Sequence, residues 1–74
     1  MIQVTYRRHR VGESLGRGYE DIAYFPTWKA AMILMARWND GNWVYEVKQV
    51  QKVANDSDRW HKDCIHYRHL WDGK

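Results

Sequence analysis

The sequence contains one cysteine, one proline and one phenylalanine among 74 residues, and it has no long hydrophobic run. A single cysteine, Cys64, cannot form a disulfide within the chain, so packing must stabilise the fold. The longest apolar stretch is far shorter than the roughly 20 residues that span a bilayer. The first residues also show no basic and then apolar leader of the kind that directs secretion. We therefore expect a cytoplasmic protein with no membrane partner.

Acidic residues are also in the minority, because nine Asp and Glu oppose twelve Lys and Arg and leave a formal net charge of +3. This balance excludes a mimic of DNA, which would need carboxylates in quantity. The positive excess is concentrated near the start of the chain, where a basic patch is predicted from Arg7, Arg8, Arg10 and Arg17. Such a patch suits phosphate or an acidic protein surface. The alternative is a solvated strand end that protects a sheet edge.

Aromatic residues are unevenly represented, with five Trp and five Tyr beside the single Phe. Trp and Tyr combine a large apolar ring with a polar group, which suits the edge of a core or an interface. A small core also recruits large side chains in order to bury enough area. The aromatic content therefore fits a binding surface, a compact core, or both.

Ile2, Val4 and Tyr6 alternate with polar residues, which predicts a half-buried strand over 2–9. A second strand is predicted over 19–25. Three glycines between positions 12 and 18 predict a turn or a long loop, since their spacing matches neither a dinucleotide fingerprint nor a phosphate loop. Pro26 ends the second segment and favours an extended residue before it. We expect an antiparallel hairpin.

The spacing of apolar residues predicts a helix over 28–38. Thr27 is a suitable N-cap, and Gly41 is expected to take the left-handed conformation at C′. Every residue from Ala30 to Ala36 is apolar, so the helix is apolar on more of its circumference than one sheet covers. A second surface should therefore cover part of it.

A third strand is predicted over 43–53, with a bulge or a strand end near Gln49, where the alternation changes phase. The segment 60–71 is ambiguous. Its residues Trp60, Cys64, Tyr67 and Trp71 form a helical stripe, whereas intrinsic propensity favours a strand. The predicted fold class is therefore α+β: one domain over 1–74, with a three-stranded, mainly antiparallel sheet (strand, strand, helix, strand), one central helix and a C-terminal helix, or alternatively a fourth strand.

The same segment holds four residue types that bind metals: His61, Cys64, His66 and His69. A helix would scatter these side chains, and a strand would divide them between its two faces, so neither closes a tetrahedral site. Cys64 would need a lowered pKa and a shaped pocket to act as a nucleophile. We therefore expect no metal, no cofactor and no catalysis.

The large tryptophans and the adaptable methionines are the candidate protein-binding residues. They are Trp28, Met32, Met35, Trp38, Trp43, Trp60 and Trp71. Burial of the helix between the sheet and the C-terminal segment is the alternative, and the partner surface would then move to the tryptophans that stay exposed.

Together these features predict a small non-enzymatic binding protein. We expect an inhibitor or adaptor of the kind found in phage and mobile elements, which docks on a host protein through its Trp, Tyr and Met side chains while its arginines steer it to an acidic surface. The alternative is a nucleic-acid-binding module that places the arginines on phosphates and stacks its aromatics on bases. A homodimer formed through the helix is a further expectation.

Overall fold

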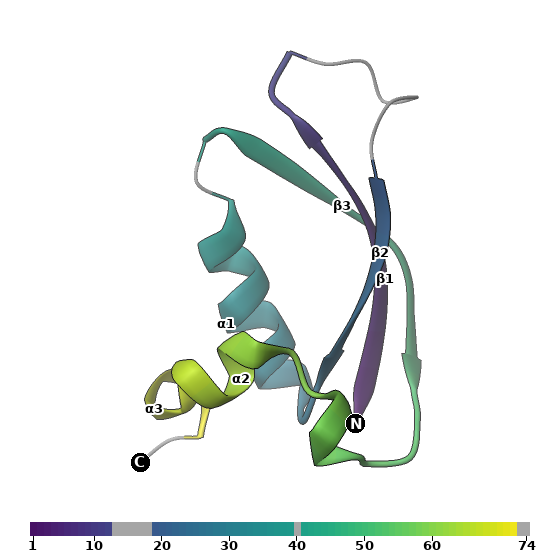
Figure 1. Cartoon of the computed structure of the whole chain (residues 1–74), viewed down its shortest axis with the longest axis vertical. Coiled ribbons are helices and arrows are strands. Elements are labelled where there is room, and N and C mark those ends of the chain that lie inside the picture. Colours follow the sequence, from purple (N-terminus) through teal and green to yellow (C-terminus); the bar gives the residue numbers. More distant parts are fainter. Residues whose placement is uncertain (13–18, 40, 73–74) are drawn as a thin grey trace.

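The structure is a computed structural model that describes residues 1–12, 19–39 and 41–72. Its three strands are β1 (Ile2–Arg10), β2 (Tyr19–Phe25) and β3 (Trp43–Lys52). They form one antiparallel sheet in the order β2-β1-β3 (Figure 1). The helical elements are α1 (Trp28–Trp38), the short 3₁₀ helix η2 (Ser57–Arg59), α2 (Lys62–His66) and α3 (Arg68–Trp71). The α+β fold predicted from the sequence is confirmed.

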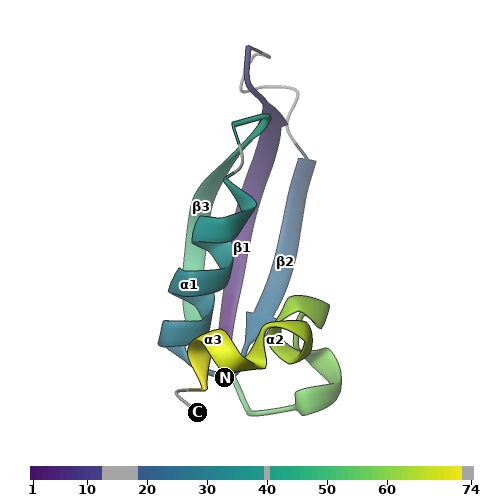
Figure 2. The same cartoon turned by 90° about the vertical axis from the view of Figure 1, so that its left-hand side faces the viewer.

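All helices lie on one face of the sheet, as the two perpendicular views show (Figures 1 and 2). The central strand β1 supplies the buried row Ile2, Val4 and Tyr6 on that face. Its neighbour β2 adds Ala23 and Phe25, which stand opposite Val4 and Ile2. The core therefore lies between the apolar face of the hairpin and the helices, as expected for a two-layer domain.

The strand β3 contains the irregularity that the change of phase predicts near Gln49. Gln49 stands opposite Thr5, but the next residue of β1, Tyr6, stands opposite Val47, so Lys48 is the extra residue of a β-bulge. The bulge brings Val47 and Val50, three positions apart, onto the same face of the sheet. The strand ends at Lys52, one residue earlier than predicted, and β1 extends one residue further than predicted, to Arg10.

The helix α1 occupies the predicted residues 28–38. The Thr27 hydroxyl accepts the Ala30 backbone N–H at 3.2 Å, which satisfies one of the open donors of the first turn. The predicted role of Gly41 needs correction. Gly41 has a left-handed φ of +90°, but the C-cap is Asn39, so Gly41 lies one position beyond C′ and serves the turn into β3.

The C-terminal segment is helical, which decides between the two predicted alternatives, but it is not one helix over 60–71. It is broken at Tyr67, whose φ of −108° and ψ of 32° end α2 before α3 begins. The Trp71 indole N–H donates to the Cys64 carbonyl at 2.7 Å, and both side chains are buried. Burying Trp71 beside Cys64 favours two short helices over a continuous one, in a segment rich in weak helix formers.

Among the described residues, no helix is both long enough and apolar enough to cross a membrane.

We predict that Leu34→Ala lowers the free energy of unfolding by about 2–5 kcal/mol, because Leu34 is 1% exposed and its removal leaves a cavity in the core. Met32→Ala in the same helix is the matched control, since Met32 is 59% exposed, and it should change stability by less than about 1 kcal/mol. Urea unfolding followed by tryptophan fluorescence measures both. Equal losses would contradict the proposed core.

Candidate functional site: a groove between α1 and β3

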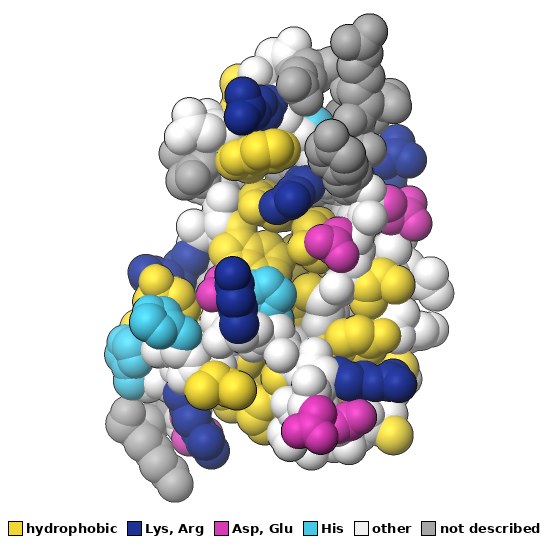
Figure 3. Space-filling view, in the orientation of Figure 1, with side chains coloured by type: hydrophobic (Ala, Val, Ile, Leu, Met, Phe, Trp, Pro, Cys, Tyr) yellow, Lys and Arg dark blue, Asp and Glu magenta, His cyan; other side chains and the backbone are white. Residues whose placement is uncertain are grey.

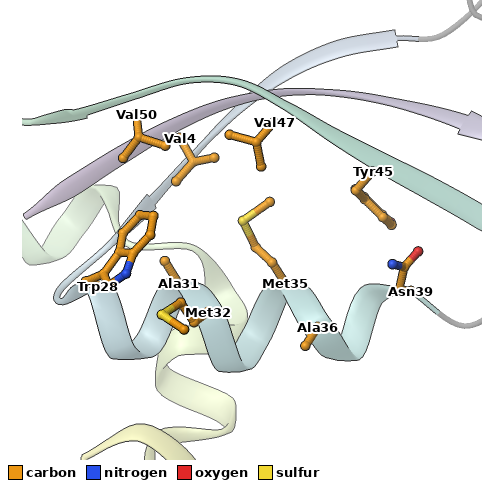
Figure 4. Close-up of a pocket in the computed structure, with 10 residues that line it drawn as sticks. All are labelled: Val4, Trp28, Ala31, Met32, Met35, Ala36, Asn39, Tyr45, Val47 and Val50. Carbon is orange, nitrogen blue, oxygen red and sulfur yellow. The ribbon is translucent and has the colours of Figure 1, made fainter.

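An open groove of about 370 Å³ separates α1 from the edge strand β3 (Figure 4). Its helix wall carries Trp28 and Met32, which are 51% and 59% exposed, and its strand wall carries Val47 and Val50, which are 49% and 40% exposed. The residues that line it are Val4, Trp28, Ala31, Met32, Met35, Ala36, Asn39, Tyr45, Val47 and Val50. Large apolar side chains exposed together in one concave site mark an interaction surface.

The groove arises because α1 buries small residues against the sheet. Ala30, Ala31 and Leu34 form its buried face, while Trp28 and Met32 lie further around the helix at the spacing of one turn. In Figure 4, Trp28 and Met35 point from the helix toward the strands. The helix is thus apolar over a wide sector, as predicted, and part of that sector has no cover among the described residues.

None of the described lining residues of the groove is charged. Two lysines are neighbours of lining residues: Lys29 follows Trp28 on α1, and Lys52 lies on the same face of β3 as Val50 by strand alternation. Lys48 lies at the bulge and pairs with Glu46 at 3.0 Å, which lowers the pKa of the Glu46 carboxyl. This pair lies on the outer face of the sheet, where Glu46 stands opposite Arg7.

The other predicted docking residues lie elsewhere. Trp38 is half-buried, and its indole N–H donates to Asp63 Oδ2 at 2.8 Å. Trp60 packs edge-on against Trp71 with ring centroids 6.0 Å apart and donates to Asn55 Oδ1. Trp71 was predicted as a docking residue, but it is only 7% exposed. It is a core residue, because the carbonyl of Cys64 satisfies its indole N–H inside the protein.

The predicted basic patch is divided between the two faces of the sheet, since neighbouring residues of a strand point to opposite sides. Arg8 and Arg10 lie over the ring of Trp43 at 5.2 and 5.4 Å from its centroid. Arg7 points to the outer face, where its register partners are Glu20 and Glu46. Arg17 lies outside the described residues. Arg7 therefore does not share a patch with Arg8 and Arg10.

A second hollow, of about 180 Å³, lies next to this Arg–Trp–Arg cluster. We call it the basic–aromatic pocket. Its lining residues are Tyr6, Arg8, Trp38, Tyr45, His61 and Lys62. Sequence reasoning missed the grouping of Tyr6, Tyr45 and Lys62, because they come from β1, β3 and α2 and meet only through the fold. Figure 3 shows this face, with Lys and Arg side chains around exposed hydrophobic groups.

The four candidate metal ligands do not converge. Cys64 is buried and its thiol lies 3.7 Å from the Tyr24 carbonyl, whereas the His61 ring packs on Trp38 at 4.8 Å between centroids. His66 and His69 are exposed on either side of Tyr67. Among the residues that the structure describes, no three His, Cys, Asp or Glu side chains are placed to share a metal ion.

No family model, no curated protein and no solved structure matches this chain. The geometry of the protein's surfaces is therefore the basis on which a function is proposed.

We predict that acidification destabilises the fold through His61. Burial lowers the pKa of this imidazole below 6.5, an effect that the charge of Asp63 partly opposes. Its neutral Nδ1 accepts the Asp63 backbone N–H at the start of α2. Because the unfolded chain binds the proton more readily, the contribution of His61 is complete above the unfolded pKa and is lost as the pH falls through the folded pKa.

The test compares the wild type with His61→Asn, which keeps an N-cap acceptor but cannot titrate. Between about pH 7.5 and pH 5, the wild type should lose more stability in urea unfolding than the variant does. The readout is the slope with pH, since the variant also loses the ring contact with Trp38. Identical slopes in the two proteins would rule out His61 as the titrating group.

We predict that the Cys64 thiol is unreactive in the folded protein. Burial, together with the nearby Asp63 carboxylate, raises its pKa to about 11, and the side chain has no exposure to solvent. The thiolate, which is the reactive form, is therefore scarce at neutral pH. A thiol reagent such as Ellman's should label Cys64 only after the protein is denatured. Fast labelling of the native protein would contradict this placement.

Proposed function

We propose that this protein acts by binding, without catalysis, and that it docks a protein partner in the groove between α1 and β3. The observation that carries the proposal is the exposure of Trp28, Met32, Val47 and Val50 along one uncharged slot. Apolar grooves of this type receive the apolar side chains of an amphipathic segment. Trp and Met suit that task, because they offer a large contact area and adapt to the shape of the partner.

The charges around the groove support a partner segment that carries carboxylates beside its apolar residues. Lys29 follows Trp28 on α1 and Lys52 lies on the same face of β3 as Val50, so two lysines lie next to residues of the groove. Arg8 and Arg10 add positive charge beyond the Tyr45 end of the groove. Complementary charge raises the rate of encounter and selects among partners.

The same charges argue against a second copy of this chain as the occupant. Two grooves brought face to face would set the flanking lysines of one copy against those of the other, in a protein with a net charge of +3. Like charges across an interface are unfavourable. An acidic partner gains from the same lysines that a homodimer would have to overcome.

The broader proposal is a cytoplasmic inhibitor or adaptor that a phage or mobile element directs against a host protein. The small size of the domain and the docking groove support this role, since a groove that holds one short segment is enough to block or bridge a partner surface. A buried and protonated Cys64 also favours binding over thiol chemistry.

The proposal predicts which peptides the groove selects. A displayed library of random peptides should yield sequences that combine large apolar residues with Asp or Glu. A selected peptide should bind Met32→Asp at least about tenfold more weakly than the wild type, because the variant places a carboxylate in the apolar slot. Ile65→Asp is the matched control, since Ile65 is an exposed helical residue that does not line the groove, and it should bind the peptide normally.

Two outcomes would overturn this proposal. One is a selected peptide whose affinity is the same for Met32→Asp and for the wild type. The other is a homodimer in sedimentation that Met32→Asp dissociates, which would show that a second copy occupies the groove.

A further inference from the structure

The basic–aromatic pocket is a binding site of different chemistry from the groove. Tyr45 lines both, and among the described residues they share no other side chain. Three rings form its apolar part. The centroid of Tyr6 lies 5.7 Å from that of Trp38 and 5.6 Å from that of Tyr45, and the Trp38 and Tyr45 centroids are 5.4 Å apart. Mutual contact among three rings fixes their orientation before any ligand arrives.

Cations from two different elements border these rings. Arg8 comes from β1 and Lys62 from the start of α2, and the described lining includes no Asp or Glu. Two carboxylates contact the rings from behind the lining, since Asp21 accepts the Tyr6 hydroxyl at 3.4 Å and Asp63 accepts the Trp38 indole N–H at 2.8 Å. These carboxylates keep their charge, but the charged groups that line the pocket itself are Arg8 and Lys62, beside an aromatic surface.

The arginine side chains are positioned in advance. Trp43 holds the guanidinium groups of Arg8 and Arg10 at 5.2 and 5.4 Å from its ring centroid. The buried Nε of Arg8 has no hydrogen-bond partner among the residues that the structure describes. Because the indole restricts both guanidinium groups, less side-chain entropy is lost when they bind an anion.

The size of the pocket limits the ligand. About 180 Å³ is below the usual range for a drug-sized molecule, and it suits one planar ring. A ligand that repeats a planar ring and a phosphate matches the aromatic surface and the cations at the same time. An acidic polypeptide would satisfy the cations and leave the ring surface without a partner.

We infer that the basic–aromatic pocket binds single-stranded nucleic acid, with one unpaired base against Tyr45 and Trp38 and with phosphates on Arg8, Arg10 and Lys62. Stacking requires an unpaired base, because the face of a base in a duplex is covered by its neighbours. This inference does not depend on the proposed function, which concerns the groove. It assigns Arg8 and Arg10 of β1 to phosphate.

The test uses a fluorescein-labelled oligothymidylate and fluorescence anisotropy at low salt. Three phosphate contacts predict a slope of log affinity against log salt of about −2, since each contact on a single strand contributes about −0.7. Lys62→Ala should weaken binding severalfold and reduce the magnitude of that slope by about 0.7. Lys62 is exposed, so its replacement leaves the core intact. Arg8→Ala is a second variant that should also weaken binding. Because Arg8 is half-buried, circular dichroism checks that this variant still folds.

Arg59→Ala is the control for charge alone, because it removes one exposed positive charge that does not line the pocket, and it should leave the affinity within about twofold of the wild type. An abasic oligomer with the same phosphates should bind at least about fivefold more weakly, as expected if a base stacks in the pocket. Met32→Asp, which alters the groove, should leave the affinity for the oligonucleotide within about twofold of the wild-type value.

Each of four results would overturn the inference. The first is the absence of oligonucleotide binding at low salt, and the second is an abasic oligomer that binds as tightly as the oligothymidylate. The third is an equal loss of oligonucleotide affinity in Lys62→Ala and Arg59→Ala. The fourth is poly-glutamate of the same charge that displaces the labelled oligonucleotide at the same concentration as unlabelled oligothymidylate does. The last result would assign the pocket to an acidic protein.

Discussion

The helix α1 meets the sheet through its smallest side chains, and the arrangement of both surfaces depends on that contact. Ala30 and Ala31 are buried to within 1% exposure, and Leu34 fills the space beside them. A helix that approaches through alanines can lie close to the hairpin, where Val4, Ala23 and Phe25 complete the core. Its larger residues are then displaced to the flank. Trp28 and Met32 face the edge strand across a groove rather than filling it.

The C-terminal segment has a different part in the same packing. The backbone N–H of His61 donates to the Tyr24 carbonyl at 2.9 Å, which attaches the segment to β2. Trp71 closes the core near Cys64, and Asp63 fixes Trp38. The C-terminal helices therefore cover the β2 side of the helix layer. None of their described residues lines the groove, which therefore stays open.

This arrangement gives the protein two neighbouring surfaces of different chemistry. The groove is apolar, with lysines next to its lining residues, which suits an amphipathic protein segment. The basic–aromatic pocket carries its cations next to its rings, which suits a ligand with alternating planar and anionic groups. Tyr45 stands between them as a shared wall. Two ligands bound at once would both contact the Tyr45 side chain, so each ligand would be affected by any movement of Tyr45 that the other causes.

Local patterns in the sequence determined the elements of this protein. The alternation of β1, the residues of α1, the Thr27 cap and the bulge near Gln49 all depend on interactions within a few residues, which a sequence displays directly. The C-terminal segment lay at the limit of such reasoning. Its stripe of large residues was visible, but the break at Tyr67 arises from the contact of Trp71 with the Cys64 carbonyl. The sequence also shows that α1 has more apolar residues than one sheet covers. It does not show which of these residues are buried in the core.

Only the tertiary structure decided which side chains face solvent together. Strand alternation separates Arg7 from Arg8, so adjacent arginines in the sequence serve opposite faces of the sheet. Trp71 and Trp28 are the same residue type at the ends of helices, yet one is buried and the other is exposed, because the C-terminal helices cover one flank of the helix layer and not the other. Tyr6, Tyr45 and Lys62 come from three elements and line one pocket. Contacts between distant segments set these outcomes, and no local pattern encodes them.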